Sequence, residues 1–225
     1  MKIKEGREVL EHQEYEILSI HVGRPHTYEF DGKQVETAIV KEPVGGPVYL
    51  SRTNFEGDGQ ADLIHHGGVD KAVCVYPADH YMYWESVLKR KLPEAAFGEN
   101  VTVKGLTEKD VCIGDIFKLG EALVQVSQPR QPCFKLAKRL NQKDMVLQVR
   151  DTGFSGFYFR VLEEGIVAPD SGLQLVSRDA HEATVSYANH LMYHDRGNHP
   201  AIRKILEVEA LSESWRSSFL KELSA

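Results

Sequence analysis

The chain has 225 residues, of which 42% are hydrophobic and 27% charged, and this composition excludes a disordered, collagen-like or disulfide-framework chain. Its formal charge of −6 leaves no basic excess for a nucleic-acid polymer, and no stretch has the roughly 20 apolar residues of a membrane helix. The charged N-terminus lacks the apolar segment of a signal peptide, and the three cysteines include no CxxC pair. We therefore expect a cytoplasmic protein with reduced thiols.

Short strands dominate the first 126 residues. Alternating or β-branched runs, separated by glycine and proline, occur at 15–20, 35–40, 48–50, 72–76, 111–119 and 122–127. Asp31-Gly32 and Gly120-Glu121 each lie between two such runs and predict hairpin turns. Strand-like alternation returns at 156–176. This many short strands favour a mainly β fold, a barrel or a sandwich, over alternating βαβ units.

Helical patterns interrupt the strands at 77–92, where Pro77 suits the first helical position, and at 134–140. After residue 177 the pattern is wholly helical. Three helices are predicted there: one capped by Asp179 and reaching 192, one opened by Asn198 and reaching 210, and one capped by Ser212 and reaching 223. We therefore divide the chain into a β domain at 1–177 and a three-helix domain at 178–225.

The string GDGQADLIHHGGVDKAV at 57–73 places two adjacent histidines, carboxylates, glycines and a lysine in a loop before a strand. Glycine lets backbone N–H groups approach an anion, and histidine and lysine add charge. The loop is either an anion-binding site or a hydrogen-bonded structural loop, and residue types alone do not choose between the two. The string FGENVTV at 97–103 is predicted to be a structural turn.

The string QPRQPCFKL at 128–136 carries Cys133 into a predicted helix start, after a turn stiffened by two prolines. Helix-terminal amides and the flanking Arg130 and Lys135 favour a lowered thiol pKa, and a thiolate is a nucleophile or a soft metal ligand. The alternative is a buried, inert cysteine, which is what we expect of Cys74 and Cys112 in their apolar runs.

Four strings resemble, in this order, the MOSC domain, which is named for the C-terminal part of molybdenum-cofactor sulfurases: GDGQADLIHHGGVDKAV, YPADHYMYW, FGENVTVKGLTEKDVCIGDIFKLG and QPRQPCFKL. The resemblance is to the stand-alone bacterial YiiM-type branch and covers almost the whole chain, including a three-helix appendage. It implies a β-barrel with flanking helices. Since 225 residues leave no room for a PLP-dependent desulfurase domain, we do not expect this chain alone to sulfurate a cofactor.

The resemblance also implies a site for the molybdenum cofactor, Mo-molybdopterin. The family cysteine matches Cys133, which is expected to ligate molybdenum or, as in sulfur-carrying relatives, to hold a persulfide. The cations expected around the cofactor are Arg52, His65, His66, Lys71, Arg130 and Lys135, with Arg160 on the opposite wall. The acidic or polar groups expected to line the pocket or to orient its bases are Asp62, Asp70, Glu99 and Asn100.

The activity that the resemblance implies is two-electron reduction of N-hydroxylated compounds, such as hydroxylaminopurines and amidoximes, to the amino form, which detoxifies base analogues. His65 or His66 would supply the proton, and both remain candidates. Electrons would come from a reductase of flavin or iron–sulfur type, because the chain has no flavin or haem motif. One alternative is a carrier of cofactor or sulfur without turnover. Another alternative is an interaction module in which residues 178–225 bind the reductase. We expect the protein to be a monomer or a homodimer.

Overall fold

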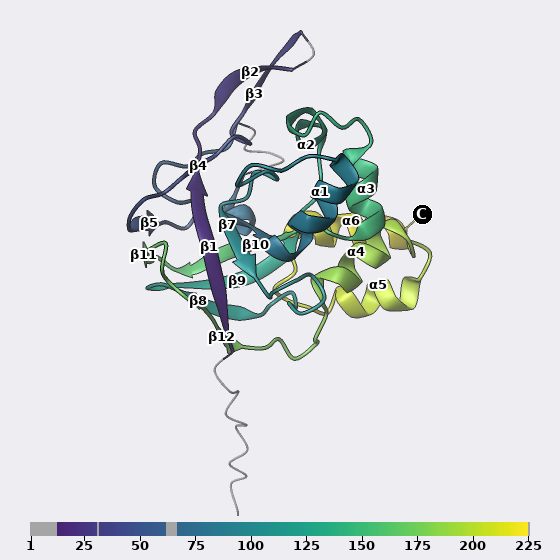
Figure 1. Cartoon of the computed structure of the whole chain (residues 1–225). Helices are drawn as coiled ribbons and strands as arrows, with labels where there is room; N and C mark the ends of the chain where they lie inside the picture. Colours follow the sequence, from purple (N-terminus) through teal and green to yellow (C-terminus); the bar gives the residue numbers. More distant parts are fainter. Residues whose placement is uncertain (1–12, 31, 62–66, 225) are drawn as a thin grey trace, which may run out of the picture.

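The computed structural model describes residues 13–30, 32–61 and 67–224. Figure 1 shows a β body with helices gathered on one side and a hairpin projecting from it. The strands are β1 Glu14–Val22, β2 His26–Phe30, β3 Lys33–Thr37, β4 Glu42–Pro43, β5 Val48–Leu50, β6 Val73–Pro77, β7 Val101–Lys104, β8 Ile116–Leu119, β9 Ala122–Pro129, β10 Phe157–Glu163, β11 Gly165–Val167 and β12 Leu173–Ser177. The helices are α1 Tyr81–Leu88, α2 Phe134–Arg139, α3 Met145–Thr152, α4 Val185–Tyr193, α5 His199–Ile205 and α6 Glu213–Leu223, with short 3-10 helices η1 Val69–Lys71 and η2 Ala78–His80.

Seven strands close into a barrel, in the order β1-β12-β8-β9-β10-β6-β7, because β1 pairs with both β12 and β7. Neighbouring strands are antiparallel except β6 and β7, which run parallel. The barrel is filled by side chains from alternate positions, as Ala122, Val124 and Val126 of β9 show, since successive residues of a strand face opposite sides. The predicted mainly β fold with flanking helices is confirmed.

The C-terminal helices α4–α6 continue the core of the barrel. Val185, Leu191, Trp215 and Phe219 are buried in the same apolar cluster as the barrel strands. The predicted helical appendage is therefore confirmed as a packed part of the fold. No helix of the described part of the chain has the length and apolar character to cross a membrane. The division of the chain at residue 177 stays a prediction.

A second apolar cluster lies between α1, α2 and α3, and it supports the segment that carries Cys133. The rings of Tyr76 and Phe97 stack with centroids 4.0 Å apart, and Trp84 donates from Nε1 to the Tyr76 hydroxyl at 2.6 Å. Leu136 of α2 is buried in this cluster. Aromatic stacking and the buried hydrogen bond fix the cluster and with it the start of α2.

Several predicted boundaries are wrong. The predicted helix at 77–92 is too long at both ends, because Pro77 is the last residue of β6, paired with Val103, and Lys89 adopts a left-handed conformation with φ 55° after α1. The predicted strand at 111–119 begins only at Ile116, because Asp115 accepts a hydrogen bond from the backbone N–H of Cys112 in a turn. The run at 35–40 ends as a strand at residue 37. The helix α3 was not predicted.

Both predicted hairpins are present, as β2–β3 and β8–β9. Asp31 of the first turn lies outside the described residues. Among the C-terminal caps, Asn198 and Ser212 are confirmed, since their side chains accept from the backbone N–H groups of Ala201 and Trp215.

The predicted cap Asp179 is wrong. Thr184 caps α4 instead, by accepting from the N–H of Tyr187, while Asp179 bonds the N–H of His181. The helix α5 also ends earlier than the predicted residue 210, because the N–H groups of Glu207 and Val208 bond carbonyls three residues back and tighten the chain out of the helix.

Buried hydrogen bonds of Glu108 connect η2, the start of β10 and α4. Nε2 of His80 lies 2.6 Å from Oε2 of Glu108, and both side chains are nearly inaccessible. The other carboxylate oxygen of Glu108 accepts from the N–H of Gly156 at 2.6 Å, and its backbone carbonyl accepts from the N–H of Ser186 at 2.7 Å. Glu108 therefore holds together segments that are far apart in the sequence.

Replacing Glu108 by glutamine is expected to lower the free energy of unfolding by about 2 kcal/mol, because a buried charge-assisted hydrogen bond to His80 is lost. Urea denaturation measures this change, with Glu209→Gln as an exposed control that shifts the free energy by less than about 0.5 kcal/mol. Equal stability of the two variants would contradict this role of Glu108.

Candidate functional site

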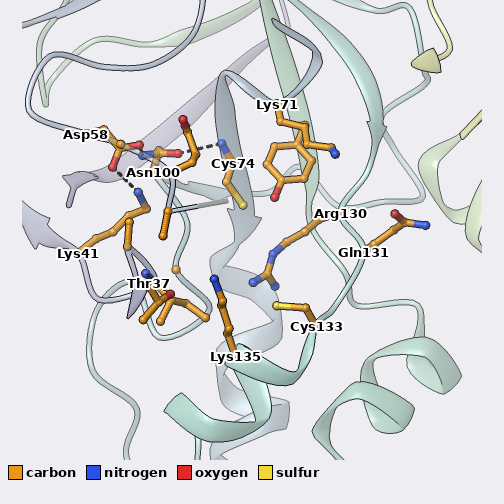
Figure 2. A pocket seen from close by; sticks show the side chains of 17 residues that line it. Thr37, Lys41, Asp58, Lys71, Cys74, Asn100, Arg130, Gln131, Cys133 and Lys135 are labelled. Atoms are coloured by element: carbon orange, nitrogen blue, oxygen red, sulfur yellow. Dashed lines mark hydrogen bonds and ion pairs between the residues drawn. The ribbon is translucent and has the colours of Figure 1, made fainter. Parts of the chain in front are cut away.

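A cavity that opens to solvent lies beside the start of α2 (Figure 2). Segments from most of the β body contribute to its walls: the chain after β3, the loop before η1, β6, the turn before β7, the end of β9 and β10. The described residues that line it are Thr37, Ala38, Ile39, Lys41, Asp58, Gly59, Gln60, Ala61, Lys71, Cys74, Gly98, Asn100, Arg130, Gln131, Cys133, Lys135 and Tyr158.

Cys133 lies at the point where the chain enters α2. Its backbone is extended, with φ −124° and ψ 169°, and its carbonyl accepts from the N–H of Leu136 at 3.0 Å as the helix begins. The side chain is half-buried, whereas Cys74 and Cys112 are buried. Figure 2 shows its sulfur beside the guanidinium of Arg130. The fold thus presents one accessible thiol to the cavity.

Arg130 is the most deeply buried cation of the cavity, with 6% of its surface exposed. Its backbone N–H donates to the carbonyl of Gly156 at 3.0 Å, and Nη2 donates to the carbonyl of Phe97 at 2.6 Å. Nη1 is buried and has no hydrogen-bond partner among the described residues. An unsatisfied buried donor costs about 1–3 kcal/mol, so the site is shaped for an acceptor brought by a ligand.

The charge around Arg130 is set by its neighbours. Burial alone lowers the pKa of a guanidinium, but the Cys74 thiol and other acidic groups nearby outweigh this effect and raise the pKa of Arg130. Burial likewise raises the pKa of Cys74 to about 11 and the pKa of Tyr158 above its usual value. Cys74 is therefore a neutral thiol near pH 7, and Arg130 stays charged.

Cations outnumber carboxylates in the cavity wall. Among its described residues, Lys41, Lys71, Arg130 and Lys135 stand against Asp58 alone. Asp58 forms a buried ion pair with Lys41, with 1% and 7% of their side chains exposed. Such an excess of cations among the described lining residues favours an anionic ligand.

Asn100 holds Asp58 in place. Its Nδ2 donates to Oδ2 of Asp58 at 2.9 Å and to the carbonyl of His21 at 3.1 Å, and its Oδ1 accepts from the N–H of Cys74 at 3.0 Å. Asp58 also accepts from the N–H of Gly23 at 2.8 Å. With its amide fully used in this way, Asn100 positions the wall of the cavity.

The structure brings together five of the residues predicted for the site: Lys71, Asn100, Arg130, Cys133 and Lys135. Asp62, His65 and His66 lie outside the described residues. The other four predicted residues, Arg52, Asp70, Glu99 and Arg160, are absent from the described lining of the cavity.

Each of these four residues has its own polar partners. Nη1 of Arg52 donates to the carbonyl of Val161 at 3.0 Å. Arg160 and Asp70 form an ion pair at 2.7 Å. Glu99 is fully buried and accepts from the hydroxyl of Tyr81 at 2.5 Å and from the N–H of Phe97 at 3.1 Å. The part that these four residues play in the site stays a prediction.

Sequence reasoning missed several lining residues, among them Thr37, Lys41, Asp58 and Tyr158. Cys74 was predicted to be core, and it is buried, but it also lines the cavity. Asp58 lies within the loop string GDGQADLIHHGGVDKAV, so the sequence could have indicated it as a candidate site residue. Nothing in the sequence around Lys41 indicates that it reaches Asp58.

The class of protein follows from the comparison with known families. Residues 62–174 match the MOSC domain family, and residues 184–225 match the YiiM-like 3-alpha helix domain. The chain therefore belongs to the MOSC domain family, in its YiiM-like form with three C-terminal helices. This confirms the resemblance read from the four strings.

Similar proteins support the same family. A Bacillus subtilis protein designated YflK is 59% identical over 213 residues, which cover 95% of this chain and 96% of YflK. The crystal structure of YiiM from Geobacillus stearothermophilus is 44% identical, with a TM-score of 0.80 over 93% of this chain and 99% of that chain. A Gibberella moniliformis protein named Reductase is 36% identical over 169 residues, which cover 72% of this chain but 29% of that protein.

Proposed function

We propose that this protein binds the molybdenum cofactor in the cavity at Cys133 and reduces N-hydroxylated compounds, such as hydroxylaminopurines and amidoximes, to the amino form. The observation that carries the proposal is the buried guanidinium of Arg130, whose Nη1 lacks a partner among the described residues, beside the half-buried thiol of Cys133. Membership of the MOSC family and the relative named Reductase support it.

The residues of the cavity fit such a group. A phosphate or another anionic acceptor would satisfy Nη1 of Arg130 in a wall that carries further cations, while the Cys133 sulfur is a soft ligand suited to a transition metal. When bound, the molybdenum cofactor supplies a two-electron centre that can take up the oxygen of an N–O bond. The protein's part is then to bind, orient and provide protons.

The reaction consumes two electrons and two protons for each N–O bond that is broken, and the oxygen leaves as water. We propose His65 or His66 as a proton source. The electrons would come from a flavin or iron–sulfur reductase, and we propose that the reaction takes place in the cytoplasm, where thiols stay reduced.

Elemental analysis tests the cofactor and a turnover assay tests the reaction. Protein from a host that makes the cofactor is expected to hold about one molybdenum per chain and to convert 6-N-hydroxylaminopurine to adenine with a reduced viologen dye. Molybdenum without turnover would favour a cofactor carrier, and a persulfide on Cys133 in the mass spectrum would favour a sulfur carrier. Protein without molybdenum from such a host would refute the proposal.

A further inference from the structure

Basic side chains gather where the end of α1 meets α2 and the loop after it. Lys89, Arg90 and Lys91 follow α1, Lys138 lies in α2, and Lys143 lies in the loop before α3. We call these five residues the basic surface. All but the half-buried Lys138 are exposed. Arg90 joins the two parts of the surface, since its guanidinium donates to the carbonyl of Leu140 just after α2.

This surface runs against the charge of the whole chain. Its five cations lie in residues 85–94 and 133–144, which hold three acidic residues, so the surface has a surplus of two positive charges in a chain whose formal charge is −6. Two further cations of these segments, Lys135 and Arg139, lie in the cavity wall and against the carbonyls of Ala95 and Ala96. Of the acidic residues, Glu85 pairs with Lys91 at 2.7 Å, and Glu94 lies 3.4 Å from Nε2 of His21. A local surplus of this kind attracts negatively charged partners and speeds their association.

The same two helices expose large apolar side chains. Met82 on α1 is 81% exposed and Phe134, the first residue of α2, is 58% exposed. A shallow groove on α1 is lined by Met82, Glu85, Ser86, Lys89, Arg90 and Lys91. Methionine and aromatic side chains within a charged rim are typical of protein–protein interfaces.

The helix α2 connects this surface to the cavity. It follows Cys133 directly, Lys135 in its first turn lines the cavity, and Lys138 in its last turn belongs to the basic surface. Six helical residues span about 9 Å, so a partner seated on the surface would lie close to the sulfur of Cys133.

We propose that the basic surface is the docking site for an acidic electron-carrier protein with a flavin or an iron–sulfur cluster. This inference rests on the proposed function, which needs two electrons per turnover. The carrier is oxidised as the N–O bond is reduced, and the two electrons enter beside Cys133. The negative charge of an acidic carrier complements the cations of the basic surface. The short distance along α2 would bring the redox centre of the carrier close to Cys133.

Flavodoxin, an acidic FMN protein kept reduced by an NADPH-dependent reductase, is a suitable probe. The test variant is Lys89→Glu/Lys91→Glu/Lys143→Glu, prepared with the cofactor bound. Its flavodoxin-driven turnover is expected to fall about tenfold at low salt. Flavodoxin binding, measured without turnover, is expected to weaken to a similar degree. Viologen-driven turnover of the same variant is expected to stay within about twofold of wild type. Salt is expected to weaken flavodoxin binding to wild type.

The matched control is Lys109→Glu/Lys118→Glu/Lys204→Glu, which makes the same change in net charge at exposed positions on the barrel and on α5. It is expected to leave flavodoxin binding and flavodoxin-driven turnover near wild type. Equal losses in both triple variants, or salt-independent binding to wild type, would overturn the docking site. If wild-type protein shows no turnover with the viologen dye, the proposed function is wrong. In that case, salt-dependent flavodoxin binding that only the first triple variant weakens would still support the docking site.

Discussion

Cys133→Ser protein from a host that makes the molybdenum cofactor is expected to contain less than about a tenth of the wild-type molybdenum and to lose N-hydroxy reduction. A serine hydroxyl stays protonated near neutral pH and is a harder ligand than a thiolate, so it binds a transition metal far more weakly. The fold should be unchanged, because the side chain is half-buried and the hydrogen bond at the start of α2 uses the backbone carbonyl of Cys133. Urea denaturation is expected to show a change below about 0.5 kcal/mol.

Cys74→Ser is the matched control, since both thiols line the same cavity. Burial holds the pKa of Cys74 at about 11, so this thiol is protonated at neutral pH and is not expected to bind metal. The control is therefore expected to retain molybdenum at a small cost in stability. Molybdenum retained in Cys133→Ser, or lost equally from both variants, would show that Cys133 is not the metal ligand.

The part of the site that could be read from the sequence is the part that is contiguous in the chain. Arg130, Cys133 and Lys135 lie within one short string, and its two prolines and helix start fix where they point. The pairing of Lys41 with Asp58 joins residues 17 positions apart, through a contact that depends on where Asn100 places its amide. Such contacts depend on the tertiary fold and leave no local pattern.

Two adjacent residues of one motif have side chains in different places. Glu99 and Asn100 were both expected to line the pocket or to orient its bases, and neighbouring side chains leave the backbone in different directions. Asn100 faces Asp58 in the cavity wall, whereas Glu99 faces the hydroxyl of Tyr81 beneath it. A motif can therefore identify a functional segment without saying which of its side chains the ligand meets.

For the fold as well, local patterns could be predicted from the sequence, whereas features that depend on the tertiary structure could not. The barrel and the C-terminal helices were predictable because alternation and caps such as Ser212 are local. The helix α3 was missed because it has eight residues, no side-chain cap and only two buried side chains, Met145 and Val149, so its apolar period is too short to recognise. Asp179 looked like a cap by type and spacing, but its backbone N–H bonds Asp115 and the helix starts later.

Replacing Arg130 by methionine is expected to separate stability from cofactor binding. The change removes one hydrogen bond to the carbonyl of Phe97, but it also removes a buried charge whose Nη1 is unsatisfied within the described structure. Exchange of a poorly satisfied buried charge for an apolar side chain of similar length is often neutral, so the free energy of unfolding of cofactor-free protein should change by less than about 1 kcal/mol. Affinity for the cofactor should fall about a hundredfold, because a buried charge-assisted contact to the anion is lost.

Arg139→Met provides the opposite case. Arg139 donates to the carbonyls of Ala95 and Ala96 at 3.1 and 3.0 Å, and it is absent from the described lining of the cavity. Losing both bonds should cost about 1–2 kcal/mol in the free energy of unfolding and leave the molybdenum content near wild type. Urea denaturation of the cofactor-free proteins and elemental analysis of the loaded ones measure the two effects. The contrary result would be an Arg130→Met protein that keeps its molybdenum and is less stable than Arg139→Met. Arg130 would then be a structural cation, and the main observation in favour of an anionic cofactor in this cavity would no longer hold.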